Sequence, residues 1–303
     1  MANYLVSGGS GFVGTHLCKL LHAQGHLVYV LTTSQKPRTA VEGIQFIFWN
    51  PKESIIDTSF QLHDCYVINL AGAGVVEKRW RNDRKKELIA SRVDSLNTLF
   101  KAIEKKQISV KHLVSASAIG YYGNGDKFFS EEDKGDDSFL SSVCQQWEAA
   151  ALQFEKLNIP VAIARIGIVF GNEAGALCEF LKPLHFGFAG IPADGNQIYS
   201  WIHVDDVSRL LYFLSSHNHR VIVNAVAPNP ATVNDIFNEL IKYTKPFFFS
   251  VHAPQFLLKI LMGEMAIEVL KSTRVQSAKI QSLGFSFLHE TIASCVKSLR
   301  VKH

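Results

Sequence analysis

A glycine-rich stretch near the start of the chain has the residue types of a phosphate-binding turn. Residues 7–14 read SGGSGFVG, and two spacings overlap there, Gly8-x-x-Gly11-x-x-Gly14 and Gly9-x-Gly11-x-x-Gly14. Either spacing lets the backbone approach a pyrophosphate closely, and it leaves the N–H groups of a following helix to bind negative charge. The alternative is a turn that is merely tight. We predict that the following residues contact a dinucleotide: Gly8, Ser10, Gly11, Phe12, Val13 and Gly14.

The elements around these glycines strengthen this interpretation. The strand-like run Tyr4–Ser7 precedes them, and leucines at helical spacing follow at Leu17, Leu20 and Leu21. A glycine motif in the strand-to-helix turn of a first βαβ unit is more specific than the same letters elsewhere.

The next strand ends without the acidic residue that usually binds the ribose of NAD about 20 residues after the glycines. The segment instead offers hydroxyls and cations at Thr32, Thr33, Ser34, Lys36 and Arg38. These groups favour a 2′-phosphate, so we predict NADP rather than NAD, with Thr32, Thr33 and Lys36 in the site. A solvated basic loop is the alternative.

Strand-like and helical patterns alternate through the first two thirds of the chain. The strand-like runs are YLVS, LVYVLT, YVINLAG, HLVSAS, VAIARIGIVFG and, after a helix that begins near Asp206, RVIVNAV. This order predicts an α/β fold with a Rossmann-type doubly wound parallel sheet. From Ala227 the pattern changes, so we place a cofactor domain at 1–171 and 201–226, and a smaller substrate domain at 172–200 and 227–303.

Composition excludes several classes of protein. The chain has 303 residues, 47% of them hydrophobic, and a net charge of +4 without a basic arm, which argues against a nucleic-acid partner. Five widely spaced cysteines form no metal-binding pattern, so we predict no metal site and reduced thiols in a cytoplasmic protein. No basic leader with an apolar core is visible, and no uncharged run is long enough to cross a membrane.

Taken together, these motifs resemble the extended short-chain dehydrogenases/reductases, in the NAD(P)-dependent epimerase/dehydratase family. More narrowly, the chain is similar to the YfcH-like branch, whose members are often labelled cell-division-inhibitor homologues. The matching motifs are SGGSGFVG, NLAG, KKELIASRV, SASAIGYYG, FLSSVCQQWEAAA, RIGIVFG, WIHVDDV and RVQSAKIQSLGFSF.

The resemblance implies roles for residues beyond the glycine turn. Leu70 and Ala71 would line the adenine-ribose side of the cofactor, Glu87 and Arg92 would approach it, and Ile168 would lie near the nicotinamide. Arg92 also follows Leu88 by one helical turn on a stripe that should face the protein, where an unpaired cation is costly. A pyrophosphate would suit it.

The superfamily's Tyr-x-x-x-Lys pair, in which the lysine makes the tyrosine an acid/base near neutral pH, is missing here. Alignment on Glu148 puts Leu140 and Cys144 at the two positions, and no tyrosine of the chain has a lysine four residues later. The remaining catalytic candidates are Ser117, with Ala118 as its alignment rival, and the neighbouring Tyr121 and Tyr122. The serine could instead only bind the loop backbone, and one tyrosine could pack in the core.

Two functions are therefore compatible with the sequence. The first is an NADP-dependent epimerase-like oxidoreductase that holds an unknown small molecule in a cleft between the domains. The second is a non-catalytic NADPH-binding sensor that acts through a protein partner. A homodimer fits both.

Other polar residues carry less weight. We interpret Cys144 as an inert packed thiol, Asp205 and Asp206 as helix caps, and His203 as either a cleft residue or a structural histidine.

Overall fold

An eight-stranded sheet forms the centre of the protein. The computed structural model describes residues 1–34, 43–57, 62–175, 177, 180, 181, 184, 187–242 and 249–299. The strand order is β13-β8-β6-β5-β1-β2-β3-β4, and every neighbouring pair is parallel except β3–β4. The strands are β1 (Asn3–Ser7), β2 (Leu27–Thr32), β3 (Ile44–Asn50), β4 (Ile55–Ile56), β5 (Leu62–Asn69), β6 (Ile108–Ala118), β8 (Val161–Ile166) and β13 (Val221–Ala225).

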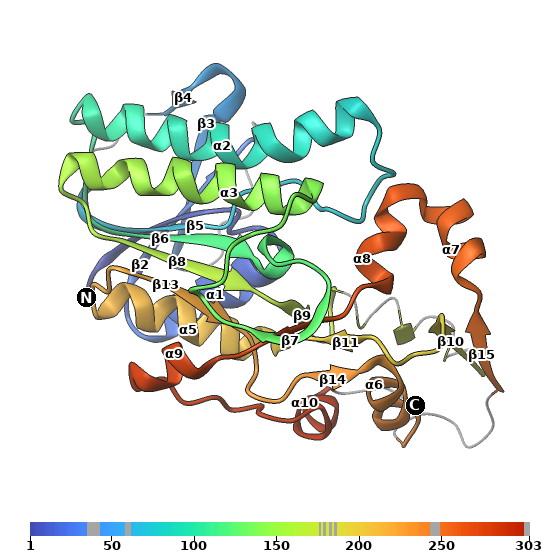
Figure 1. Ribbon diagram of the computed structural model, residues 1–303. Coiled ribbons are helices and arrows are strands. Elements are labelled where there is room, and N and C mark those ends of the chain that lie inside the picture. Colours follow the sequence, from blue (N-terminus) through green and yellow to red (C-terminus); the bar gives the residue numbers. More distant parts are fainter. Residues whose placement is uncertain are drawn as a thin grey trace.

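Helices cover both faces of this sheet (Figure 1). Helices α1 (Phe12–Ala23) and α5 (Val204–Ser216) lie on one face, and α2 (Asn82–Glu104) and α3 (Phe139–Leu152) on the other. Side chains alternate along β1, so Val6 packs into the core under α1 and α5, and Leu5 into the core under α2 and α3. The predicted Rossmann-type doubly wound sheet is confirmed.

Two strands of this sheet lie outside the runs that the sequence analysis identifies. The first, β3, pairs in parallel with β2, and the second, β4, is a two-residue antiparallel addition. In β3, only Ile47 and Trp49 are buried, because the strand lies near the edge of the sheet. Its mixed pattern, with the exposed Gln45, does not read as a continuous apolar strand.

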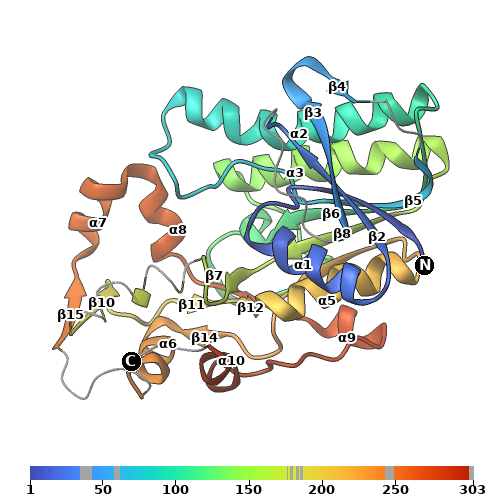
Figure 2. The same cartoon turned by 180° about the vertical axis from the view of Figure 1, so that it is seen from behind.

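The remaining strands and helices build a second region, the C-terminal lobe, mostly from residues 187–200 and 227–299, together with three strands from residues 125–129, 168–170 and 201–203 (Figure 2). One sheet has the order β14-β11-β16-β7, and two others pair β10 with β15 and β12 with β9. These strands are β7 (Gly125–Phe129), β9 (Ile168–Phe170), β10 (Phe188–Pro192), β11 (Ile198–Tyr199), β12 (Trp201–His203), β14 (Ala231–Thr232), β15 (Phe249–Ala253) and β16 (Thr273–Val275).

The C-terminal lobe also contains the remaining helices of the described residues. They are α6 (Val233–Lys242), α7 (Gln255–Met262), α8 (Ala266–Leu270), α9 (Ala278–Ser282) and α10 (Ile292–Ser298), and short 3-10 turns lie at Pro51–Glu53, Ile119–Tyr121, Gln153–Leu157 and Gly263–Met265. The hydroxyl of Thr232 accepts the backbone N–H of Asp235 at 3.0 Å and thereby caps the start of α6. The domain boundaries stay a prediction, and β7, from the first half of the chain, pairs with β16.

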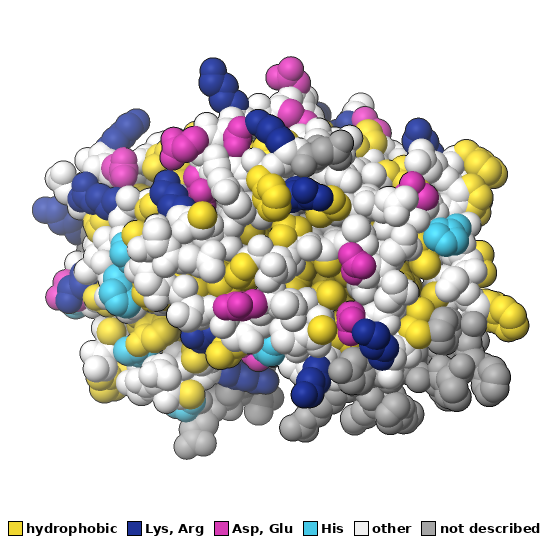
Figure 3. Space-filling view, turned by 60° about the horizontal axis from the view of Figure 1, so that its bottom comes forward, with side chains coloured by type: hydrophobic (Ala, Val, Ile, Leu, Met, Phe, Trp, Pro, Cys, Tyr) yellow, Lys and Arg dark blue, Asp and Glu magenta, His cyan; other side chains and the backbone are white. Residues whose placement is uncertain are grey.

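The lobe leaves apolar side chains at the surface. Figure 3 shows hydrophobic side chains between polar and charged ones across the face of the molecule that lies at the bottom of Figure 1. Helix α7 buries none of its residues, and its Phe256 and Ile260 are about two thirds exposed. Among the described residues, no helix combines the length and the apolar character needed to span a membrane.

Candidate functional site

The glycine turn is tightly packed at the carboxyl end of β1. Gly8 has a φ of +69°, and a Cβ there would lie 2.6 Å from the carbonyl oxygen of Leu70. A Cβ at Gly14 would overlap the carbonyl oxygen of Gly8, and the N–H of Gly11 donates to that same oxygen at 2.9 Å. Glycine is therefore required at both positions, because Gly8 lies directly against the segment that follows β5 and Gly14 lies against the backbone of the turn itself.

The N-terminus of α1 points out of this turn without a side-chain cap. Its N-cap is Gly11, and the first turn of the helix contains no acidic residue. A Cβ at Gly11 would meet only the carbonyl oxygen of Gly8 within 4 Å, at 3.2 Å. Uncapped N–H groups with open space before them form a binding site for an anion. The neighbouring Ser10 is exposed, Phe12 packs against Gly171 and Gly175, and Val13 joins the core.

Asn69 ends β5 beside this turn, and the sequence analysis did not single it out. The residue is fully buried, and its Oδ1 accepts hydrogen bonds from the hydroxyls of Ser7 and Ser95. Its amide nitrogen is buried and has no hydrogen-bond partner among the described residues. A buried donor without a partner costs about 1–3 kcal/mol. The only signal in the sequence is a polar residue that closes an apolar strand.

Arg92 lies on α2, against the residues that follow β5. Its side chain is 8% exposed, its guanidinium donates to the carbonyls of Leu88 (2.9 Å) and Ala73 (3.2 Å), and it lies 5.0 Å from the centre of the Trp147 ring. Burial lowers the pKa of Arg92. No carboxylate pairs with this cation within the part of the chain that the structure describes.

Arg84, on the same helix, makes an instructive contrast. It pairs with Glu87 at 2.8 Å and with Glu77 at 3.0 Å, and the hydrogen bond from Arg84 lowers the pKa of Glu87. The carboxylate of Glu87 is therefore engaged by its own helix. Arg92, by contrast, has no counter-charge among the residues that the structure describes.

Several of the other predicted cofactor residues lie at the carboxyl ends of the strands, near the glycine turn. Leu70 and Ala71 lie against Gly8, and their contact with a cofactor stays a prediction. Thr32 is buried at the end of β2, where its Oγ1 accepts the N–H of Ser34 at 3.2 Å, and Thr33 is exposed. Ile168 is half-buried on β9, beside β12. Lys36 lies outside the described residues.

Ser117 belongs to a buried ionic network. Its Oγ donates to Oε1 of Glu148 at 2.7 Å, and Arg165 binds both oxygens of that carboxylate at 2.9 Å. All three residues are buried. The hydroxyl proton of Ser117 is thus directed at Glu148 and not at open space.

The two candidate tyrosines differ in their surroundings. The phenol of Tyr122 donates to Oδ1 of Asn224 at 2.7 Å and accepts from Arg165 at 2.9 Å, and burial raises its pKa to about 12. The ring of Tyr121 lies 3.5 Å from the guanidinium carbon of Arg165 and is half-buried. Tyr122 is therefore built as a core residue, and Tyr121 is the more accessible phenol.

Leu140 and Cys144, which the resemblance puts at the positions of the superfamily's tyrosine and lysine, both lie in packed surroundings. Leu140 lies against Gly120, whose Cβ position is 3.3 Å from the Leu140 Cβ. The thiol of Cys144 is 3.6 Å from the carbonyl oxygen of Ala118, and burial raises its pKa to about 11. These contacts agree with the interpretation of Cys144 as a packed thiol.

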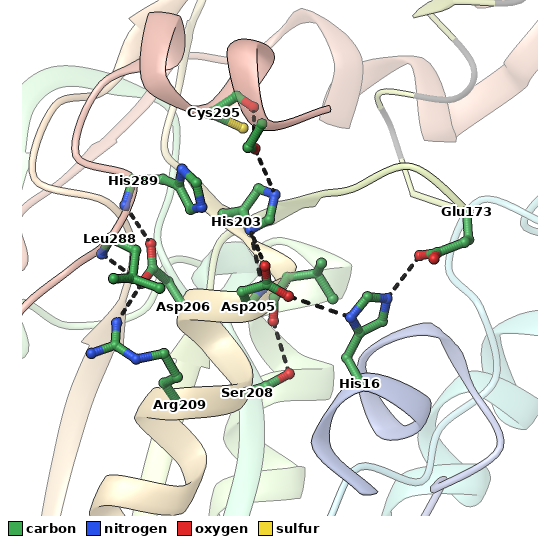
Figure 4. A network of polar contacts seen from close by, with 12 residues as sticks. His16, Glu173, His203, Asp205, Asp206, Ser208, Arg209, Leu288, His289 and Cys295 are labelled. Atoms are coloured by element: carbon green, nitrogen blue, oxygen red, sulfur yellow. Dashed lines mark hydrogen bonds and ion pairs between the residues drawn. The ribbon is translucent and has the colours of Figure 1, made fainter. Parts of the chain in front are cut away.

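Residues 201–207 (WIHVDDV) fix the start of α5 and bind the backbone of the loop at Leu288 and His289 (Figure 4). The expectation that Asp205 and Asp206 cap α5 is wrong, because His203 is the N-cap and its Nδ1 accepts the N–H of Asp205 at 3.2 Å. Asp206 instead accepts the N–H groups of Leu288 and His289 at 2.8 Å. Burial lowers the pKa of His203 to about 4.

The doubly wound sheet and its glycine turn are those of a Rossmann-type protein, and sequence comparison gives the family. Residues 4–225 match the NAD dependent epimerase/dehydratase family, and residues 253–299 match a domain of unknown function, DUF1731. The chain belongs to this epimerase/dehydratase family, as its motifs led us to expect. The narrower YfcH-like assignment stays a prediction.

Particular relatives extend the match over the whole chain. It is 32% identical to the epimerase family protein SDR39U1 homolog, chloroplastic, of Arabidopsis thaliana, over 97% of this chain and 85% of that one. It is 30% identical to the epimerase family protein YfhF of Bacillus subtilis (98% and 97%). The crystal structure of human epimerase family protein SDR39U1 (isoform 2) with NADPH is similar at a TM-score of 0.85 and 27% identity, covering 98% of both chains.

Proposed function

We propose that this protein is an NADP(H)-dependent oxidoreductase of the epimerase/dehydratase type that acts on a small molecule. The observation that carries the proposal is the glycine turn, where Gly8 and Gly14 allow no side chain and the uncapped start of α1 opens beside Gly11. The family relation supports a nicotinamide dinucleotide as the cofactor. The NADPH in the human relative's structure supports NADP in particular.

The residues around the turn fit such a cofactor. A pyrophosphate would accept the N–H groups at the start of α1, and the buried cation of Arg92 would gain a counter-charge. The amide nitrogen of Asn69, which has no partner in the described part of the chain, is a further donor beside the turn. Among the described residues that end β2, Thr32, Thr33 and Ser34 offer hydroxyls and no carboxylate to repel a 2′-phosphate.

The cofactor would supply hydride transfer, and the chain would orient the substrate. Tyr121 is the accessible phenol for a substrate carbonyl or hydroxyl, and Ser117 could serve only by releasing its bond to Glu148. General acid/base assistance typically contributes 10² to 10⁴ in rate. We therefore expect turnover that is slow compared with relatives that keep the tyrosine–lysine pair.

Calorimetry tests the binding step. NADPH should bind the full chain with one site and at least tenfold more tightly than NADH, because only NADPH carries the 2′-phosphate. A preference for NADH would refute the choice of NADP, and heat from neither coenzyme would refute the site itself. Deuteride transfer from labelled NADPH to a library of carbonyl compounds and nucleotide sugars then tests the reaction.

A second candidate, an NADPH-binding sensor without turnover, is favoured by one observation. The hydroxyl of Ser117 is held by a carboxylate that Arg165 also clamps, and apolar Leu140 occupies the usual tyrosine position. Under this function, NADPH binds but no deuteride leaves it. Tyr121→Phe separates the two functions, because it should slow an enzyme and leave the binding of NADPH by a sensor unchanged.

A further inference from the structure

Exposed apolar side chains gather at the outer end of the C-terminal lobe. More than half of the large hydrophobic side chains that the described residues expose belong to this one region, which we call the outer patch. Figures 1 and 2 both place β15 and α7 at the same end of the molecule, away from the eight-stranded sheet. The members of the outer patch are Phe188, Phe249, Val251, Phe256, Leu257, Ile260, Leu261 and Ile267.

The strand part of the outer patch is the open face of a small sheet. Side chains alternate along a strand, so Phe249 and Val251 point to the same face of β15. Phe188 is the register partner of Phe249 on β10 and therefore lies beside it on that face. All three side chains are at least half exposed. This small sheet thus presents an apolar face to solvent.

The helical part of the outer patch is a stripe along α7. Phe256 lies one turn before Ile260, and Leu257 one turn before Leu261, so these four side chains adjoin. The exposed parts of the three phenylalanines of the outer patch alone amount to roughly 400 Å², at about 200 Å² per phenylalanine. That area is already within the range of the largest patches on typical monomers. The aliphatic side chains extend it toward the about 800 Å² that each partner buries in a stable complex.

One edge of β15 is unpaired. The strand is parallel to β10, and the N–H of Phe249 donates to the carbonyl of Gly187 just before β10 at 2.9 Å. In a parallel pair, alternate residues direct their backbone groups to the same neighbour, so Ser250 and His252 direct theirs to the other edge. No strand of the described ranges pairs with that edge. Edge strands are commonly protected from association by lysine or proline, and Phe249–Ala253 contains neither.

We propose that the outer patch and the free edge of β15 form the interface of a two-fold symmetric homodimer. With Val251 on the symmetry axis, two antiparallel copies of β15 place Ser250 of one copy opposite His252 of the other. Each free N–H then meets a free carbonyl, so the edge is complementary to itself. Because α7 follows β15 directly, α7 of each copy begins beside Phe249 of the other, and apolar side chains meet across the axis.

A membrane surface fits these residues less well than a second copy does. Lipid cannot satisfy the free backbone groups of Ser250 and His252, whereas a paired strand can. Helices that lie on membranes are rich in lysine and arginine on their polar face, and the sequence of α7, QFLLKILM, contains a single basic residue, Lys259. This low charge instead suits the core of a protein–protein interface.

Light scattering and analytical ultracentrifugation of the full chain test the proposal. The native chain should be a dimer at micromolar concentration. Phe249→Glu and Ile260→Glu should each raise the dissociation constant of the dimer at least tenfold, because each substitution brings a carboxylate into the interface. Leu288→Glu is the matched control, since Leu288 is also exposed but lies outside the outer patch, and it should leave the dissociation constant unchanged.

Disulfide formation tests the register. In a chain that carries Cys178→Ser, the other native cysteines are buried, so an engineered surface cysteine is the reactive one. Val251→Cys puts its thiol opposite that of the second copy, where the two Cα atoms lie about 4.5 Å apart, and it should form an intermolecular disulfide under mild oxidation. Phe249→Cys is the control, because residue 249 is more exposed but lies about 14 Å from its counterpart along the paired strands. It should cross-link at least tenfold more slowly.

Any of three results would overturn the proposal: a native chain that stays monomeric at micromolar concentration, a dimer that both glutamate substitutions leave intact, or equal cross-linking of the two cysteine variants. A monomer that sediments with vesicles of phosphatidylcholine and phosphatidylserine would also refute it, in favour of a membrane. Circular dichroism of each variant shows whether it is folded. NADPH affinity should be the same in the native chain and in Ile260→Glu, so a failed dimer interface and a failed cofactor site give different results.

Discussion

Arg92 and Arg84 are both buried arginines of α2, but they differ in their partners. Within the described residues, the hydrogen-bond partners of Arg92 are carbonyl oxygens, whereas Arg84 pairs with two carboxylates. A cation that is buried without a counter-charge lowers stability until an anion arrives. The proposed pyrophosphate would be that anion.

Arg92→Met should therefore weaken NADPH binding about 10- to 100-fold, since charge-assisted hydrogen bonds are worth about 1.5–3 kcal/mol. The free energy of unfolding without cofactor should stay equal or rise, because an uncompensated charge is removed. Calorimetry and urea unfolding measure the two effects. Arg84→Met is the control and should change NADPH affinity less than threefold; equal losses in both variants would contradict the assignment.

Glu148 and Arg165 form a buried ion pair whose contribution to stability can be tested. Removal of one partner from a buried ion pair typically costs about 3–5 kcal/mol, whereas an apolar replacement of both is often tolerated. Glu148→Leu should thus lower the free energy of unfolding by about 3–5 kcal/mol, and adding Arg165→Met should restore part of that loss. Urea unfolding measures both, and a double variant that is less stable than Glu148→Leu would refute this account.

Single residues show how far sequence reasoning reaches. Arg92 follows Leu88 by one helical turn in the sequence, which predicts that its side chain faces the protein. In the structure this side chain is buried. The bond between Ser117 and Glu148 does not follow from spacing, because it depends on where α3 packs on β6 and β8. The capping role of His203 was equally hidden, since the following aspartates are the more common caps.

At the scale of elements, the turn before α1 is the part that local sequence defines most completely. Its glycines, the strand before it and the helix after it are all where the sequence predicts them. The strand β3 is the counterexample, because its half-buried residues at the edge of the sheet give no strong periodic signal.

Gly11→Ala separates the binding role of this turn from its folding role. A methyl group at Gly11 meets one backbone oxygen at 3.2 Å, so the free energy of unfolding should fall by only about 1 kcal/mol. NADPH affinity should fall at least tenfold, because the methyl group occupies the space before the uncapped N–H groups. Calorimetry and thermal unfolding check this, with Thr15→Ala on the exposed side of α1 as control.

Gly14→Ala should behave differently, since its methyl group overlaps the carbonyl oxygen of Gly8. We expect a loss of folded protein on expression rather than a folded chain that has lost its cofactor. A Gly14→Ala protein with native stability would contradict the close packing of the turn.

At the scale of the whole molecule, burial controls the chemistry of the thiols. Cys18, Cys65, Cys144 and Cys295 are buried, and burial raises their pKa values to about 12, 12, 11 and 12. The folded pKa values exceed the unfolded value near 9, so the neutral thiols contribute stability below pH 9. This contribution is lost as pH rises through 11 to 12.

Cys178 lies outside the described residues, so the test uses Cys178→Ser. At pH 8 this variant should react with iodoacetamide far more slowly in its native state than in urea, since thiolate is the reactive form. Mass spectrometry counts the modified cysteines. Rapid native labelling of Cys144 would show that this thiol is more accessible and more acidic than its packing implies.

Strand β7 pairs with a strand that the ribosome synthesises much later. Its neighbour Asn124 accepts the N–H of Ser272, 148 residues later, and β7 pairs with β16 beyond it. A ribosome that has finished the first parallel strands must still synthesise most of the remaining chain before this pairing can form. The nascent protein therefore carries an unfinished edge through half of its synthesis, and chaperones that shield exposed strands would act during that interval.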